Sequence, residues 1–321
     1  MNRTVLTIAT GKDLYLQLAI NLARSFFLWH TEGSINFKIV TDSVTPLPAD
    51  LVNKIQLQLV QPGELGESFS SKLYLDKLAN EGQTVFIDSD CLIFGNLLTV
   101  FEDFKGHDVS VIGGYISEGE WFGDIASICK KFNVPHIPKF NGGIYYIEKG
   151  HKATEVYSTA RELEKRYTEI GFVKLRDKPN DELLMGLAMQ LHGQTPVTDD
   201  STIMSDPQAC PGPYQIDVIN GKALLINPPA PDLRHQSWYP FHEVRPLVFH
   251  FLGYYTMHYP YRREVYLLKK ACSGKLSVAD RVIAKLTIEY PERLKQTLKN
   301  TFRGIYRAVF GVRRIKPSQR I

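Results

Sequence analysis

A short apolar segment that ends in two acidic residues constrains the fold of this chain more than any other feature. Val85, Phe86 and Ile87 form an uninterrupted apolar run, which is typical of a strand buried on both faces of a sheet. The run ends at Asp88-Ser89-Asp90. Because ligands bind beyond the carboxyl ends of the strands in open α/β sheets, the segment predicts two carboxylates at a ligand-binding edge.

Two carboxylates one residue apart can both face a hard divalent cation. Mg²⁺ and Mn²⁺ bind carboxylates together with the phosphate oxygens of a substrate. Asp88 and Asp90 are therefore candidate metal ligands of a site for a nucleotide diphosphate. The alternative is a plain turn at the end of a strand, because aspartate is common in turns and so short a pattern is weak by itself.

Strands and helices alternate before this segment. The apolar pattern predicts strands at 4–9, 35–40, 55–60 and 85–87 and helices at 14–29 and 68–78. Asp13 is interpreted as the cap of the first helix. This order is that of βαβ units, so we expect an open, mostly parallel sheet flanked by helices.

The pattern is less regular further along the chain. We expect strands at 109–112, 144–147, 223–226 and 247–252, and helices at 125–131, 151–167 and 181–191. Gly113-Gly114 should end the strand before them, and most of 115–138 should be irregular. The segment 196–246 should be rich in loops, because it holds 9 of the 18 prolines.

Composition indicates an ordinary soluble globular protein. Of the 321 residues, 44% are hydrophobic and 22% are charged. No apolar run approaches the roughly 18 residues that a membrane span needs, and the N-terminus does not have the pattern of a signal peptide. The four cysteines (Cys91, Cys129, Cys210 and Cys272) are scattered, which favours a reducing cytoplasm and argues against a structural zinc site.

The basic charge of the chain is concentrated in its C-terminal part. Residues 275–321 hold 12 Lys or Arg and 3 Asp or Glu, a local charge of +9 within a total of +4, which leaves −5 elsewhere. We therefore divide the chain into a domain at 1–258 and a basic helical tail at 259–321. Nucleic acid is not expected as a partner, because no recognised binding motif accompanies the charge.

The tail has the pattern of an amphipathic helix. An apolar stripe lies beside a basic stripe that contains Lys295, Lys299, Arg303 and Arg307, and the apolar residues are Leu294, Leu298, Phe302, Ile305 and Val309. Such a helix can lie on an anionic membrane surface, here the inner face of the membrane, and the cluster at 313–316 adds further cations. The alternative is a helix packed on the domain with a solvated basic face.

Six segments, taken in order, resemble the retaining nucleotide-sugar glycosyltransferases of the glycogenin type (glycosyltransferase family 8), which include bacterial lipooligosaccharide galactosyltransferases. The segments are ATGKDLY at 9–15, SSKLYLDKL at 70–78, VFIDSDCLIFGNL at 85–97, FNGGIYYIEKG at 140–150, NDELLMG at 180–186 and HFLG at 250–253. The resemblance covers roughly 4–258. It implies the Rossmann-like GT-A fold, a UDP-sugar donor and a glycan, glycolipid or other hydroxyl acceptor.

The resemblance also implies a set of donor-binding residues. Ala9 and Thr10 match backbone contacts to the nucleoside, Asp13 and Tyr15 match polar and stacking residues, and Asp42 is a further candidate. Tyr15 could equally pack at the start of a helix. The remaining matches concern the diphosphate and the sugar, and they are Lys72, Ser89, Asn141, Gly142 and Gly253. Lys72 could instead be a solvated helix lysine, and Asn141 a plain turn residue.

Asp88 and Asp90 match the metal ligands of the family, and His250 matches the third ligand. Two carboxylates and an imidazole suit Mn²⁺ (or Mg²⁺). A histidine in an apolar strand can also be a core residue that is hydrogen-bonded there, which is the alternative for His250. The cofactor that the resemblance implies is thus Mn²⁺ or Mg²⁺.

Asp181 and Glu182 match the reacting face of the donor sugar, and the expected catalytic residues are these two. Glu182 departs from the family, which commonly has glutamine there. A carboxylate could stabilise an oxocarbenium-like transition state or act as a nucleophile, whereas the structural alternative for both acids is helix capping. A second departure is Thr256, where the family commonly has a lysine that His258, Arg262 or Arg263 could replace.

Two other functions fit parts of the pattern. A sugar-phosphate nucleotidylyltransferase uses a similar sheet and metal, but it usually has a glycine-rich phosphate loop that Thr10 to Tyr15 lacks. A catalytically silent module that binds a nucleotide sugar or a membrane surface is compatible with the missing lysine at Thr256.

Overall fold

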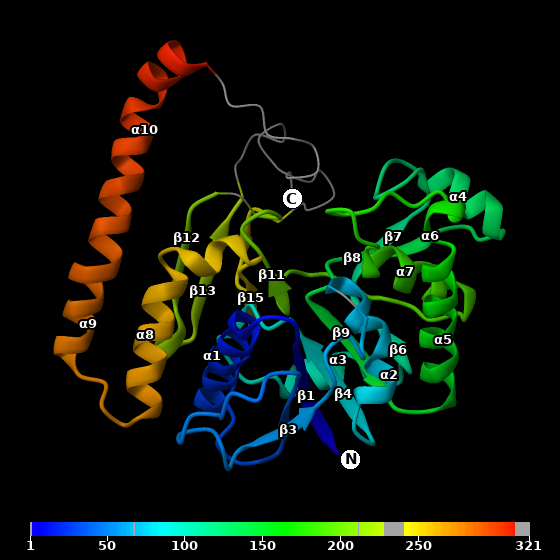
Figure 1. The fold of residues 1–321 in the computed structure, drawn as a ribbon, viewed down its shortest axis with the longest axis horizontal. Coiled ribbons are helices and arrows are strands. Elements are labelled where there is room, and N and C mark those ends of the chain that lie inside the picture. The colour runs from blue at the N-terminus through cyan, green and yellow to red at the C-terminus, as the bar shows by residue number, and fades with distance from the viewer. Residues whose placement is uncertain (1, 67, 211, 228–240, 312–321) are drawn as a thin grey trace.

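The computed structural model describes residues 2–66, 68–210, 212–227 and 241–311 (Figure 1). Its centre is a six-stranded sheet in the order β3-β2-β1-β4-β9-β6. The strands of this sheet are β1 (Arg3–Ala9), β2 (Asn36–Thr41), β3 (Ile55–Leu59), β4 (Gln83–Ile87), β6 (Val109–Ser110) and β9 (Ile144–Glu148). The first four pair in parallel, as predicted, and β9 runs antiparallel to β4 and β6.

The helices cover both faces of this sheet (Figure 1). They are α1 (Asp13–Trp29), α2 (Leu75–Leu78), α3 (Leu98–Asp103), α4 (Ile125–Phe132), α5 (His151–Lys165), α6 (Tyr167–Ile170) and α7 (Asp181–Leu191), with 3₁₀ turns η1 (Ser68–Tyr74) before α2 and η2 (Val218–Asn220) further along. A mostly parallel sheet between helices is the predicted α/β class.

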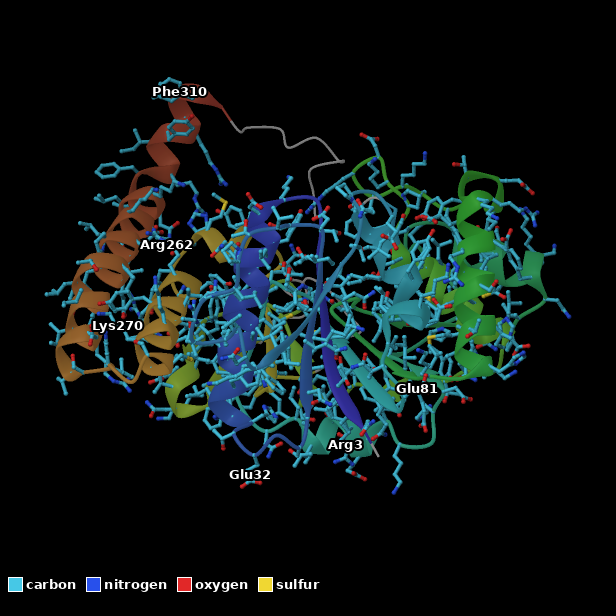
Figure 2. The ribbon with its side chains drawn as sticks, turned by 60° about the horizontal axis from the view of Figure 1, so that its bottom comes forward. Arg3, Glu32, Glu81, Arg262, Lys270 and Phe310 are labelled. Carbon is cyan, nitrogen blue, oxygen red and sulfur yellow. The ribbon has the colours of Figure 1, made fainter. Side chains whose placement is uncertain are left out.

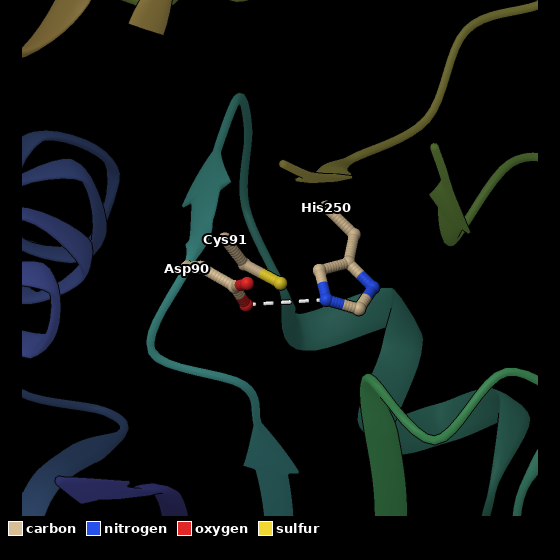
Figure 3. Close-up of side chains that lie close together, drawn as sticks. All are labelled: Asp90, Cys91 and His250. Carbon is tan, nitrogen blue, oxygen red and sulfur yellow. Dashed lines mark ion pairs between the residues drawn. The ribbon is translucent and has the colours of Figure 1, made fainter. Parts of the chain in front are cut away.

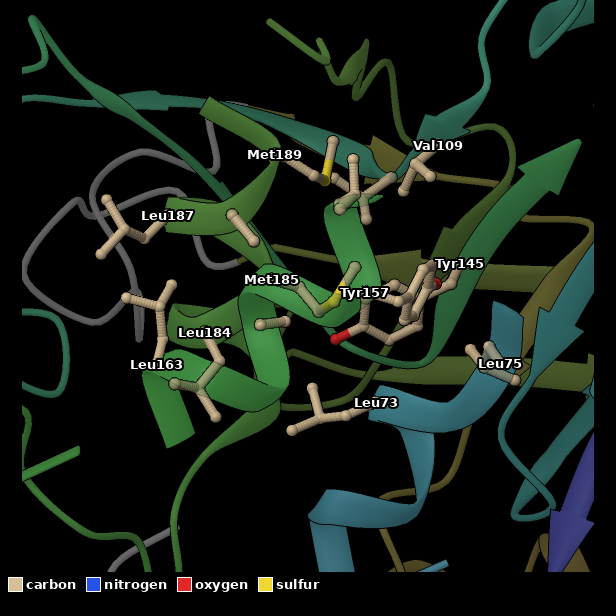
Figure 4. Packing of buried hydrophobic residues seen from close by; sticks show 14 of the residues in the cluster. Leu73, Leu75, Val109, Tyr145, Tyr157, Leu163, Leu184, Met185, Leu187 and Met189 are labelled. Atoms are coloured by element: carbon tan, nitrogen blue, oxygen red, sulfur yellow. The ribbon is translucent and has the colours of Figure 1, made fainter. Parts of the chain in front are cut away.

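The apolar run before the acidic residues packs on both faces of the sheet. Val85 and Ile87 belong to the core under α1, whereas Phe86 belongs to the core under α5 and α7. All three side chains are at most 1% exposed. Figure 4 shows the second core, where Tyr145 and Tyr157 pack among leucines and methionines of η1, α2 and α7. Burial on both faces is why the run does not alternate with polar residues.

Three small sheets flank the central sheet. Their strands are β5 (Cys91–Ile93), β7 (Ile112–Ile116), β8 (Ile137–Phe140), β10 (Val197–Thr198), β11 (Met204–Ser205), β12 (Tyr214–Asp217), β13 (Lys222–Ile226), β14 (Glu243–Val244) and β15 (Val248–His250). The sheet β11-β15-β5 positions the candidate site, because β15 runs antiparallel to β5 and pairs His250 with Cys91.

Some local predictions are wrong. Asp13 is the first helical residue rather than the cap, since Lys12 holds the cap position and the Asp13 carboxylate accepts a hydrogen bond from Ser43 Oγ. Gly113 and Gly114 lie inside β7, and β8 lies in the stretch expected to be irregular. A Cβ at Gly113 would lie 2.2 Å from the carbonyl oxygen of Lys139, so this glycine permits close approach of two strands and does not form a turn.

The chain continues after the small sheets as a succession of helices. They are the 3₁₀ turn η4 (Tyr254–Met257), α8 (Tyr261–Cys272), α9 (Val278–Ala284), the π-helical turn η5 (Lys285–Glu289) and α10 (Tyr290–Phe310). α8 packs against α1, where Tyr261 and Leu268 are buried and Asn21 donates a hydrogen bond to the Tyr261 hydroxyl. The division of the chain into a domain and a tail at 258/259 stays a prediction. α8, the first α-helix after this position, packs on the domain through α1.

α10 is the helix that the apolar and basic stripes predict. It stands beside α8 and extends away from the body, with Phe310 at its far end (Figures 1 and 2). All 21 of its residues are described, and none is buried. The apolar stripe of this helix is therefore exposed, whereas its first turn is held beside α8, because Glu292 pairs with Arg262 and Arg293 donates a hydrogen bond to the Tyr259 hydroxyl. The membrane role of the tail stays a prediction. The cluster at 313–316 lies outside the described residues, and within those residues no helix is long and apolar enough to cross a membrane.

Candidate active site

Asp88, Asp90 and His250 come together at the carboxyl edge of the central sheet. The Asp88 amide donates a hydrogen bond to the carbonyl oxygen of Gly143 (2.9 Å), which ties the end of β4 to the start of β9. His250 Nε2 lies 3.1 Å from Asp90 Oδ1 and 3.7 Å from Asp88 Oδ2. Figure 3 shows the Asp90 carboxylate facing the His250 ring. β15 thus brings a residue 160 positions away to the acidic pair.

This set of atoms fits a divalent cation. Around a metal with ligand bonds of about 2.1 Å at right angles, neighbouring ligand atoms lie about 3 Å apart. The distances of 3.1 and 3.7 Å between His250 Nε2 and the two carboxylates are close to that spacing. Two carboxylates and one imidazole suit Mn²⁺ or Mg²⁺ better than soft metals. Asp88, Asp90 and His250 are the residues that would hold the ion.

Cys91 also lies at this cluster. One ligand atom each of Asp90, Cys91 and His250 lies within 4.8 Å of the others, and Figure 3 shows the sulfur near the ring. Burial, and then the charges of Asp90 and Asp88, raise the pKa of the Cys91 thiol well above its usual range. A protonated, soft sulfur is a poor ligand for a hard cation, so we do not count Cys91 among the ligands for Mn²⁺.

The carboxylates and cations of the site stabilise one another. Burial would lower the pKa of His250, but the Asp90 carboxylate, its hydrogen bond and Asp88 outweigh burial and raise that pKa to about 9. Burial raises the pKa of Asp88. Burial would also raise the pKa of Asp90. The charge of His250 and a hydrogen bond from the Gly253 amide to Asp90 Oδ2 (2.6 Å) outweigh burial and keep the Asp90 pKa below its usual value. A cationic imidazole thus offsets part of the negative charge of the acidic pair when no metal is bound.

Lys72 lies between the acidic pair and the start of α7. Its Nζ lies 2.9 Å from Asp88 Oδ2 and 3.7 Å from Asp181 Oδ2, and it donates a hydrogen bond to the carbonyl oxygen of Gly142 (2.8 Å). Burial would lower the pKa of Lys72, but the charges of Asp181 and Asp88 raise it above its usual value. The solvated-lysine alternative does not hold, because this side chain is only 11% exposed.

Asp181 and Glu182 point back toward β9 from the first turn of α7. Tyr145 Oη donates a hydrogen bond to Asp181 Oδ2 (2.5 Å), and the Gly142 amide donates one to Glu182 Oε1 (2.7 Å). Burial and the neighbouring Asp181 raise the pKa of Glu182 to about 8. The side chain that caps α7 is that of Asn180, which accepts a hydrogen bond from the Leu183 amide.

Asn141 connects His250 to an aspartate that the sequence analysis did not single out. Asn141 Oδ1 accepts a hydrogen bond from the Gly143 amide (2.9 Å) and lies 3.2 Å from His250 Nδ1, while Asn141 Nδ2 donates to Asp206 Oδ2 (3.1 Å). Asp206 is 5% exposed. It follows β11 in a proline-rich segment, and no motif in the sequence links it to residues 65 positions earlier.

The residues predicted to bind the nucleoside lie at the ends of β1 and β2 and in the first turn of α1. The Asp42 carboxylate accepts hydrogen bonds from the Gly11 amide (3.0 and 2.9 Å) and so fixes the turn after β1. Ala9 is buried at the end of β1, and Thr10 follows it. Tyr15 is 38% exposed, so its ring is accessible from solvent. Their role in binding stays a prediction.

The remaining candidates lie beside the acidic pair. Ser89 is buried, and Gly253 adopts φ +60°, which lets its amide face Asp90. Thr256, which replaces the expected lysine, is buried, and its hydroxyl donates to the Gly253 carbonyl oxygen. Arg263 does not replace that lysine freely, because its guanidinium is paired with Glu264 and Glu289.

The structure is similar to two solved structures of the galactosyltransferase LgtC. In a complex with donor and acceptor sugar analogs, LgtC is 13% identical, the match covers 86% of this chain and 97% of LgtC, and the TM-score is 0.53. An active-site variant of LgtC, with glutamate in place of a glutamine, is 14% identical in sequence. The match again covers 86% of this chain and 97% of LgtC, and the TM-score is 0.52. No family model and no curated protein matches the sequence. The chain therefore has the predicted GT-A fold, and at these identities the likeness shows the fold alone.

Proposed function

We propose that this chain is a glycosyltransferase that moves a hexose from a UDP-sugar to a hydroxyl acceptor, with Mn²⁺ or Mg²⁺ and with retention of configuration. The observation that carries the proposal is the convergence of Asp88, Asp90 and His250 at the ligand-binding edge of a GT-A fold. Solved neighbours of this fold include a galactosyltransferase with donor and acceptor sugar analogs.

The charges around the acidic pair support this reaction. A bound cation would neutralise the departing diphosphate as a Lewis acid. Lys72 is fixed beside Asp88 and would place a second positive charge near the phosphates. Gly253 has no side chain and would let the backbone approach a phosphate closely. Ala9, Thr10, Asp13, Tyr15 and Asp42 would hold the nucleoside.

Asp181 and Glu182 would lie at the reacting face of the sugar. The Tyr145 hydroxyl and the Gly142 amide fix their carboxylates, so both are oriented before a substrate binds. LgtC has an active-site glutamine, and Glu182 matches the position where the family commonly has glutamine. Because its pKa is raised to about 8, Glu182 is largely protonated near neutral pH. We propose that its deprotonated form is the active one, in which the carboxylate stabilises positive charge that develops at the anomeric carbon.

A panel of UDP-sugars tests this function without knowledge of the acceptor. The protein is incubated with each sugar, with Mn²⁺ or with a chelator, and release of UDP is measured. We expect one UDP-hexose to be hydrolysed only with the metal. UTP and sugar phosphates serve as the control, because pyrophosphate release from them would point to a nucleotidylyltransferase instead.

A silent binding module is the second candidate function. Thr256 replaces a lysine that the family commonly uses for phosphate, and Arg263 is already paired with acidic side chains. Metal-dependent binding of a nucleotide sugar, measured by calorimetry, without turnover of any nucleotide sugar would favour this candidate over the enzyme.

The acceptor is proposed to be a glycan or glycolipid that docks near the loop-rich region at 196–246, of which 211 and 228–240 lie outside the described residues. α10 supports a membrane-bound acceptor. An exposed apolar stripe runs along this basic helix, and its residues are Leu294, Leu298, Phe302, Ile305, Tyr306, Val309 and Phe310. We propose that residues 275–321 bind an anionic membrane surface, on the inner face of the membrane, as a tail attached to a cytoplasmic domain.

Flotation with vesicles tests the tail. The protein should bind vesicles that contain anionic phospholipid more strongly than neutral vesicles. Leu298→Glu with Phe302→Glu changes two exposed side chains (48% and 55% exposed), so it should abolish binding without unfolding the domain. Removal of 275–321 should have the same effect. Binding that neither change reduces would contradict the role of α10.

A further inference from the structure

Both carboxylate oxygens of Asp206 accept hydrogen bonds, although one of them would be enough to fix the local turn. Its Oδ1 accepts hydrogen bonds from the amides of Gln208 (2.7 Å) and Ala209 (2.9 Å), which is enough to fix the local turn. Its Oδ2 accepts a hydrogen bond from Asn141 Nδ2 (3.1 Å), on a different part of the chain. The second oxygen of a buried carboxylate thus points toward the candidate metal site.

The partners of Asn141 fix the orientation of its amide. The Gly143 amide can only donate, so the atom that faces it is Oδ1. The Asp206 carboxylate accepts, so the atom that faces it is Nδ2. Because Oδ1 also faces His250 Nδ1 (3.2 Å), the imidazole must donate from Nδ1. This leaves Nε2, which faces Asp88 and Asp90, as the atom that can bind a metal.

We propose that Asp206 is a positioning residue for the metal site, acting through Asn141 to hold His250 with Nδ1 as donor and Nε2 as ligand. This inference rests on the proposed metal-dependent function. Histidine ligands of metals usually donate their other N–H to a carboxylate, carbonyl or water, and loss of such a partner lowers metal affinity about 10- to 100-fold. In this chain the partner is an amide oxygen that a buried carboxylate orients.

The arrangement also gives Asn141 a role besides the predicted contact with the donor sugar. Its carbonyl oxygen is shared between the Gly143 amide and His250, and one N–H of its amide nitrogen is directed at Asp206. The second N–H is the group that remains for a sugar hydroxyl. Asn141 could therefore orient the metal ligand and contact the sugar at the same time.

Asp206→Asn tests the inference because the side chain keeps its shape but carries an NH₂ group, which donates hydrogen bonds, in place of a carboxylate oxygen, which accepts them. In either amide orientation, the new NH₂ faces another donor, Asn141 on one side or the two turn amides on the other. We expect the affinity for Mn²⁺, measured as free Mn²⁺ by electron paramagnetic resonance in the presence of UDP, to fall about 10- to 100-fold.

The exchanged pair, Asn141→Asp with Asp206→Asn, gives each of these hydrogen bonds a donor and an acceptor again with the same total charge, and only the bond between residues 141 and 206 reverses its direction. It should return the Mn²⁺ affinity to near the wild-type value, which a variant that merely damages the fold would not do. Asp217→Asn is the matched control, because Asp217 caps the turn before Asn220 in the same way without contacting His250 or Asn141. Its Mn²⁺ affinity should equal that of the wild type.

The outcomes separate this inference from the proposed function. Wild-type Mn²⁺ affinity in Asp206→Asn, or no recovery in the exchanged pair, would overturn the inference and leave the proposed function standing. A wild-type protein that binds no Mn²⁺ with UDP present would overturn the metal-dependent function itself and, with it, the inference. Thermal unfolding without metal identifies a variant that is not folded, and in that case the exchanged pair decides.

Discussion

Lys72→Met isolates the electrostatic balance of the site. The substitution keeps an unbranched chain of similar length and removes the ammonium group. That group now pairs with Asp88 at 2.9 Å, hydrogen-bonds the Gly142 carbonyl oxygen at 2.8 Å and lies 3.7 Å from Asp181. The Lys72 and Asp88 side chains are 11% and 21% exposed. Without the ammonium, two partly or fully buried carboxylates would lose their shared cation.

The expected loss of stability follows from this geometry. Removal of one partner from a buried ion pair costs about 3–5 kcal/mol, and the partial exposure of Asp88 places this pair near about 3 kcal/mol. With an unfolding entropy of about 2.1 cal/mol/K per residue, 3 kcal/mol in a chain of 321 residues corresponds to a Tm lower by about 4–5 °C. Thermal unfolding followed by circular dichroism measures this shift.

Mn²⁺ makes the test specific to the site. A cation bound by Asp88 and Asp90 would replace the missing positive charge, so Mn²⁺ should raise the Tm of Lys72→Met more than that of the wild type. Lys152→Met is the matched control, since Lys152 forms an exposed pair with Glu155 (3.1 Å) that contributes less than about 1 kcal/mol. Equal Tm losses in the two variants, or equal effects of Mn²⁺ on Lys72→Met and wild type, would refute the reasoning.

Three further predictions concern a buried glutamate of α8 and two residues of the candidate site. Burial outweighs the charge of Arg263 and raises the pKa of Glu264 to about 7. As the pH rises from about 4.5 to 7, the unfolding free energy of the wild type, measured by urea titration, should therefore fall by up to about 3 kcal/mol relative to that of Glu264→Gln. A difference between the two proteins that stays constant with pH would contradict this. A Cβ at Gly143 would lie 2.7 Å from His250 Nδ1, so Gly143→Ala should weaken Mn²⁺ binding, whereas Gly114→Ala, in open space, should not. Glu182→Gln can still accept the Gly142 amide, so it should keep UDP affinity in calorimetry but lower kcat for donor hydrolysis about tenfold or more; an unchanged kcat would remove Glu182 from the reaction.

The sequence predicts the parts of this fold that depend on local pattern. The apolar run before Asp88 required a strand buried on both faces, and β4 is that strand. α7 begins and ends where the pattern at 181–191 places it, because Asn180 supplies a strong cap. The order of strands and helices was enough to predict parallel pairing of the first four strands.

Contacts between segments that lie far apart in the sequence could not be predicted from local sequence pattern. The pairing of His250 with Cys91 depends on the register of two antiparallel strands, which no local pattern specifies. Asp206 carried no motif, and its partner lies in another segment. The sequence pattern predicts a strand end at Gly113, because the close approach of β8 that requires a glycine there appears only in three dimensions.

The measurement that tests the central claim most directly is metal-dependent release of UDP from UDP-hexoses by the wild-type protein and by Asp90→Ala. The account predicts that one UDP-hexose is hydrolysed with Mn²⁺, that a chelator stops the reaction, and that Asp90→Ala, which removes a proposed ligand beside His250, abolishes it. Turnover that continues unchanged in Asp90→Ala or with the chelator would contradict the proposed site. Failure of every UDP-sugar, with metal-dependent binding intact, would contradict the enzyme and favour the binding module.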